Sequence, residues 1–124
     1  MTANDVDFFN RIKSQLSELH SEMGLLSKGK PDHPVNSFKL KFINEKIEEA
    51  NKILIGDFKP LRDFSKFEDD TLPSNSDVVM ILSQYLNSLE GWRSAHVELE
   101  SKGWVWSAED RTIRAEPPSS FRQA

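Results

Sequence analysis

The spacing of apolar residues constrains this chain more than any other feature of its sequence. In three segments such residues recur at alternating intervals of three and four, the period of one face of an α-helix. The stripes are Phe9, Ile12, Leu16, Leu19, Met23 and Leu26; Leu40, Ile43, Ile47, Ala50 and Leu54; and Val78, Leu82, Tyr85, Leu89, Trp92, His96 and Leu99. A lone helix cannot remove its stripe from water, so the three predicted helices must pack together.

Capping and terminating residues bound these segments. We expect the first helix to be capped by Asn4 and to end near Lys28, before Gly29. The second is expected to begin at Asn36 or Ser37 and to end at Gly56. The third is expected to start at a cap formed by Ser74 and to run to Lys102, before Gly103.

Two shorter elements are predicted outside the long helices. The connection over residues 57–75 is too long to be structureless, and Pro60 with three apolar residues at three-residue steps predicts a short helix or 3₁₀ segment over residues 60–68. After Gly103, the β-prone runs 104–106 and 112–114 predict a small hairpin. Residues 117–124 are expected to form a flexible tail.

The predicted architecture is therefore a mainly α-helical single domain. It is an antiparallel, up-down-up bundle of three long helices with one short helix in the second connection. Residues 1–103 form the bundle, and residues 104–124 form a C-terminal hairpin or extended arm with its tail. A chain of 124 residues is long enough to bury such a core without disulfides.

Composition argues against several classes of partner. The 20 acidic and 16 basic residues are mixed along the chain, so no basic face is indicated and no nucleic-acid partner is expected. The sequence contains no long apolar run and no apolar leader at its start, so we expect no membrane partner and a cytoplasmic location.

The residues also show no pattern typical of a catalytic, cofactor or metal site. The absence of cysteine excludes thiol nucleophiles and cysteine-ligated metals. No Glu-x-x-His pair of the di-iron bundles and no glycine-rich phosphate loop occurs. We therefore expect no cofactor, no metal and no enzymatic activity.

One short segment resembles a known family. The run Leu19-His20-Ser21-Glu22-Met23-Gly24 resembles the phosphorylated helix of histidine phosphotransfer domains, which are also helical bundles. The resemblance implies that His20 is a phosphoacceptor. The family carries a lysine three residues after the histidine, and this chain has Met23 there. Phosphorelay through His20 is thus the alternative function.

Aromatic residues outside the three stripes suggest an interaction surface, because aromatic and arginine side chains dominate binding hot spots. The candidate residues are Trp104, Trp106, Phe64, Phe67, Arg111 and Arg114. The same aromatics could instead cover the end of the bundle as a lid, and the two roles are compatible.

The leading hypothesis is a non-enzymatic protein-interaction module, an adaptor, chaperone-like or regulatory protein that binds another protein or itself as a homodimer. A coiled-coil-like stripe serves internal packing and dimerisation equally well. The second alternative is a helical bundle that binds a small ligand among Phe58, Phe64, Phe67 and Trp92.

Overall fold

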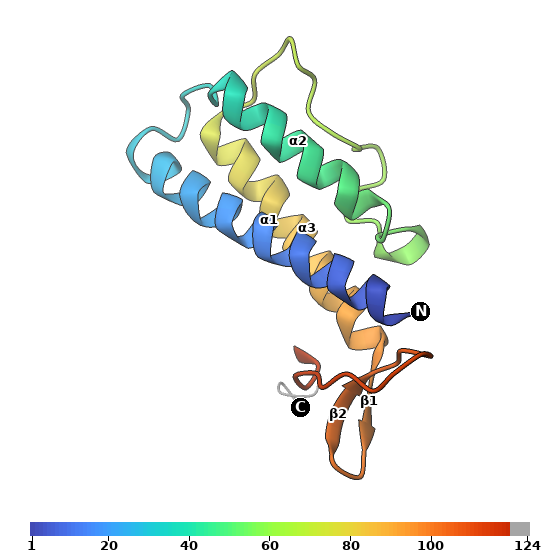
Figure 1. Ribbon diagram of the computed structural model, residues 1–124. Coiled ribbons are helices and arrows are strands. Elements are labelled where there is room, and N and C mark those ends of the chain that lie inside the picture. Colours follow the sequence, from blue (N-terminus) through green and yellow to red (C-terminus); the bar gives the residue numbers. More distant parts are fainter. Residues whose placement is uncertain (120–124) are drawn as a thin grey trace.

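The computed structural model describes residues 1–119; the end of the predicted tail, residues 120–124, lies outside the described residues (Figure 1). The fold is mainly helical, with a small antiparallel hairpin near the C-terminus. The elements are α1 (Ala3–Gly29), α2 (Ser37–Asn51), the 3₁₀ turn η1 (Gly56–Phe58), α3 (Asn75–Ala95), β1 (Val97–Glu100) and β2 (Gly103–Trp106).

The predicted stripes form the core where the three helices meet. Completely buried stripe residues come from every helix: Phe9, Ile12, Leu16, Met23, Ile43, Ile47, Ala50, Val78, Leu82, Tyr85 and Leu89. The clearest exceptions lie at stripe ends, where Leu26 is 40% exposed and Leu99 is 62% exposed. Helical period therefore identified the buried faces correctly.

The direction of α3 differs from the up-down-up prediction. The Val35 backbone N–H donates to the Pro73 carbonyl at 2.8 Å, and the Asn75 N–H donates to the His33 carbonyl at 2.9 Å. The start of α3 therefore lies beside the start of α2, and α3 runs parallel to α2 and antiparallel to α1 (Figure 1). Phe9, near the start of α1, accordingly stacks on Trp92, near the end of α3.

The returning connection explains this direction and corrects the predicted short helix. Residues 60–68 are not helical, and the only helical turn in this part of the described chain is η1. An extended chain covers about 3.3 Å per residue and a helix 1.5 Å, so a connection that travels back along the bundle must be extended.

Asparagine side chains fasten this connection to the helices. Asn44 on α2, 6% exposed, exchanges two 2.9 Å hydrogen bonds with the backbone N–H and carbonyl of Phe67. Asn51 donates to the Ser65 carbonyl at 2.8 Å and accepts from the Tyr85 hydroxyl of α3 at 2.7 Å. These bonds satisfy backbone groups that an extended segment cannot satisfy by itself.

The C-terminal hairpin forms earlier in the sequence than predicted. Helix α3 ends at Ala95, not Lys102, and β1 pairs with β2 in the register Val97↔Trp106 to Glu100↔Gly103. Gly103 lies in the hairpin at a φ of +121°, a conformation that favours glycine. The predicted second strand, residues 112–114, contributes only a single bridge between Arg114 and Val105.

The helix caps agree with the prediction at two of three starts. The side-chain carbonyl oxygen of Asn36 accepts a hydrogen bond from the Phe38 N–H at 2.8 Å, and the Ser74 hydroxyl accepts one from the Asp77 N–H at 3.2 Å. Helix α1 begins earlier than expected, after Thr2, and α2 ends earlier, at Asn51 instead of Gly56. The Thr2 N–H donates to the Asp5 carboxylate, which lowers the pKa of Asp5.

Candidate functional site

The two tryptophans of the predicted interaction surface pack inward against the bundle. Trp106 is 5% exposed, lies edge-on to Phe9 at 5.3 Å between ring centroids, and lies 6.2 Å from Trp92. Trp104 is half-buried against the same core. The hairpin therefore covers the end of the α1–α3 pair, which is the lid arrangement.

The predicted phenylalanines lie on a different part of the molecule. Phe64 and Phe67, both half-buried, meet edge to face at 5.1 Å, and Phe64 lies 6.3 Å from Tyr85. Their ring contacts are with each other and with Tyr85, whereas those of Trp106 are with Phe9 and Trp92. The structure does not bring the predicted aromatic residues into one cluster.

The two predicted arginines are exposed. Arg111 lies in the loop after the hairpin, and Arg114 donates to the Lys102 carbonyl at 2.6 Å. Arg114 thereby links the segment after the hairpin to the hairpin turn. A role for either residue in binding a partner stays a prediction.

His20, the alternative phosphoacceptor, lies half-buried on α1 and faces α3. Its Nε2 atom lies 2.8 Å from the Ser83 hydroxyl oxygen, within hydrogen-bond distance. The nitrogen that would have to reach an incoming phosphoryl donor is thus already engaged by a neighbouring helix. Whichever atom donates, the contact with Ser83 occupies Nε2, so this nitrogen is not free to attack a phosphoryl group.

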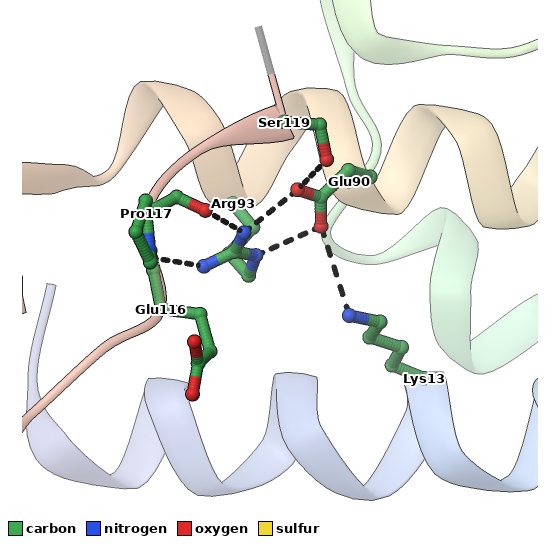
Figure 2. A network of polar contacts seen from close by, with 6 residues as sticks. All are labelled: Lys13, Glu90, Arg93, Glu116, Pro117 and Ser119. Carbon is green, nitrogen blue, oxygen red and sulfur yellow. Dashed lines mark hydrogen bonds and ion pairs between the residues drawn. The ribbon is translucent and has the colours of Figure 1, made fainter. Parts of the chain in front are cut away.

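Helix α3 carries a partly buried ion pair that is not among the predicted site residues (Figure 2). The Arg93 guanidinium donates to both carboxylate oxygens of Glu90, Nε to Oε1 at 2.8 Å and Nη2 to Oε2 at 2.7 Å. Arg93 is 7% exposed, and Lys13 of α1 lies 3.6 Å from Glu90. The Glu-x-x-Arg spacing indicates such a pair, but it carries no information about burial.

The same arginine holds the segment that follows the hairpin, residues 113–119, which we call the strap. Its Nη1 and Nη2 atoms donate to the carbonyls of Glu116 and Pro117, each at 2.8 Å, and the Ser119 hydroxyl donates to Glu90 at 2.6 Å (Figure 2). Chiefly through the Arg93 hydrogen bonds, the pKa of Glu90 is lowered to about 2. The pair therefore stays charged and binds the strap through polar contacts.

An open pocket of about 570 Å³ lies beside this network. Its walls come from α1, α3, β2 and the strap, and its lining residues include Asn10, Lys13, Glu90, Arg93, Trp106 and Glu116. The aromatic ligand pocket predicted among Phe58, Phe64, Phe67 and Trp92 does not correspond to it, because none of those four residues lines this pocket.

The outer face of α2 exposes two aromatic side chains that are not among the predicted site residues. Phe38 is 68% exposed and Phe42 43% exposed, and their rings meet edge to face at 5.0 Å. They lie four residues apart, on the side of α2 opposite its buried stripe. The sequence signal for their exposure is that neither phenylalanine belongs to the apolar stripe of this helix.

Charge is distributed unevenly along α2. Its first seven residues contain Lys39 and Lys41 and no acidic residue, whereas residues 44–51 contain Glu45, Glu48 and Glu49 with one lysine. This order opposes the helix dipole, which favours acidic residues at the N-terminus and basic residues at the C-terminus. The stability of the isolated helix does not account for this order.

No family model matches this chain, and searches of curated proteins and of solved structures give no match either. Within residues 1–119, no helix is both long and apolar enough to cross a membrane.

Proposed function

We propose that this chain is a non-enzymatic protein-interaction module that associates with a second copy of itself through the outer face of α2. The observation that carries the proposal is the exposed pair Phe38 and Phe42, 68% and 43% exposed. Aromatic residues contribute large contact areas at interfaces, and two adjacent exposed phenylalanines on one helix are typical of such a surface.

The charge order of α2 supports a second copy as the partner. In a two-fold symmetric interface the same patch meets itself. An antiparallel crossing of two α2 helices brings the basic first half of each copy against the acidic second half of the other, so the charge order favours this direction. If the two antiparallel helices cross at the level of residue 43, Lys41 of each copy lies opposite Glu45 of the other. Lys41 makes no ion pair within the described residues, so it is available for this contact.

Sedimentation velocity and light scattering across a wide concentration range test the proposal. The unmodified chain should show reversible dimers, and Phe38→Ser/Phe42→Ser should be monomeric. A matched control is Met80→Ser/Leu99→Ser, because Met80 and Leu99 are 56% and 62% exposed on other elements and should leave the dimer intact. A monomer at every concentration, or equal loss in both double variants, contradicts the proposal.

A charge exchange tests the orientation separately. Lys41→Glu and Glu45→Lys should each weaken the dimer, because each places like charges opposite one another, and the double variant should restore it. Restoration would exclude a general effect of surface charge on solubility. If the double variant is as weak as either single one, the antiparallel arrangement is wrong.

A further inference from the structure

The strap is bound to the rest of the molecule as a peptide ligand would be bound. Along β2, the Trp106 N–H donates to the Ile113 carbonyl at 2.9 Å, and the Ala115 N–H donates to the Trp104 carbonyl at 3.0 Å. These two bonds flank the bridge between Val105 and Arg114, so the strap lies antiparallel along the free edge of the hairpin. Addition of an extended segment to a sheet edge is a common mode of peptide recognition.

Residues of α3 bind the part of the strap that extends beyond the hairpin. The Arg93 guanidinium binds the consecutive carbonyls of Glu116 and Pro117, and Glu90 accepts the Ser119 hydroxyl (Figure 2). Pro118 is buried, and because proline has no backbone N–H, its burial creates no unsatisfied hydrogen-bond donor. Pro117 also keeps Glu116 extended, because the residue before a proline avoids helical conformation.

Nearly all of these contacts go to backbone atoms of the strap. The groove therefore selects an extended backbone followed by a proline pair and a hydroxyl, and the Arg114 side chain adds a contact to the Lys102 carbonyl of the hairpin turn. We propose that the groove formed by the edge of β2 with Arg93 and Glu90 of α3 is a peptide-binding site. In this structure the chain's own strap occupies it, and its partner is a segment of another protein in which an extended stretch leads into Pro-Pro-Ser or Pro-Pro-Thr.

A partner segment must compete with the covalently attached strap, whose effective concentration is on the order of millimolar for a short flexible link. The site is thus self-inhibited, and weakening the strap should increase binding in trans. This groove is separate from the outer face of α2 and does not depend on the proposed dimer. Phe38→Ser/Phe42→Ser should accordingly leave peptide binding unchanged.

The experiment uses a fluorescent peptide with the sequence of residues 113–119 and the full chain. Ala115→Pro removes the N–H that donates to Trp104 and changes no groove residue. By fluorescence anisotropy, the peptide should bind the Ala115→Pro chain at least tenfold more tightly than the unmodified chain. A control peptide, in which the alanine that corresponds to Ala115 is replaced by proline, should bind the Ala115→Pro chain at least tenfold more weakly than the unmodified peptide does. Equal affinities in either comparison overturn the proposal.

A reversible lock gives a second test that does not depend on the folding of the Ala115→Pro chain. Val105 and Arg114 form a bridge between backbone hydrogen bonds, the position where antiparallel side chains approach most closely, and the chain has no cysteine of its own. Val105→Cys/Arg114→Cys should bind the peptide when reduced and lose binding when oxidised. Unchanged binding on oxidation overturns the proposal. If the reduced chain is instead a dimer and the disulfide abolishes that dimer, the groove binds the strap of a second copy.

Discussion

Arg93 holds Glu90 in a two-point ion pair one helical turn away on α3, with N–O distances of 2.8 and 2.7 Å. With Arg93 only 7% exposed, the pair is shielded from solvent more than an ordinary surface pair. The backbone carbonyls of the strap satisfy further guanidinium donors. The pair therefore joins α3 to the C-terminal segment, and its protonation state matters for stability.

Glu90 should make the stability of this protein depend on pH in the acid range. Its pKa in the folded chain is about 2, below its ordinary value of 4.5. Its stabilising contribution, on the order of 2 to 3 kcal/mol, is therefore complete above pH 4.5 and is lost as the pH falls toward 2. Urea unfolding of the wild type and of Glu90→Gln between pH 7 and about pH 2 measures this contribution.

The Glu90→Gln variant should be less stable at neutral pH, and its stability should change less over the acid range. Exposed carboxylates contribute equally to both proteins, so the difference between the two curves isolates Glu90. Parallel curves would show that the pKa of Glu90 is not lowered in the folded chain.

Asn44→Ala should destabilise the fold by about 2 kcal/mol, because it leaves the partly buried N–H and carbonyl of Phe67 without their side-chain partner. Asn87→Ala is a suitable control, since Asn87 is an exposed asparagine of α3 for which alanine improves helix propensity. Chemical denaturation measures both variants. Similar stabilities would mean that the connection does not depend on this contact.

Tyr85 is the only tyrosine in the sequence, so its ionisation can be followed directly by tyrosinate absorbance. Burial raises its pKa above 10.0, although the hydrogen bond to Asn51 acts in the opposite direction. The phenol should therefore ionise at higher pH in the folded protein than in the urea-unfolded chain. Its contribution to stability is present below pH 10 and is lost as the pH rises through the folded-state pKa. Coincident titrations in the two states would contradict this expectation.

His20 provides a test of the phosphorelay alternative. With Nε2 within hydrogen-bond distance of Ser83, we expect no phosphoryl adduct when the protein is incubated with phosphoramidate. Intact mass measurement detects any adduct, and His20→Ala identifies its position. An adduct on the wild type that is lost in His20→Ala would favour phosphotransfer over the interaction module.

Much of the helical framework could be predicted because its signals are local. Helical period identified the buried stripes, and the Asn36 and Ser74 caps depend on residues only two or three positions away. The end of α3 was placed too late because apolar spacing continues through His96 to Leu99. In the structure Val97 leaves the helix to pair with Trp106, a contact that local spacing does not encode.

The candidate sites depended still more on long-range contacts. Composition showed a surplus of aromatic residues, but not which of them would be exposed. Trp106 is buried because the hairpin folds onto Phe9 and Trp92, whereas Phe38 and Phe42 stay exposed because nothing in the described chain packs over the outer face of α2. The spacing of Glu90 and Arg93 in the sequence indicates an ion pair, but the burial of Arg93 comes from the strap, more than twenty residues away.

The formation of three amphipathic helices, and the face that each one buries, follow from the amino-acid sequence alone, because helical period and capping are local properties. The direction of α3, the position of the strap and the exposure of the outer face of α2 are visible only in the folded structure. Each of these depends on contacts between distant residues, such as Asn44 with Phe67 and Arg93 with Pro117. Whether such contacts form depends on how the whole chain packs, and no local pattern carries that information.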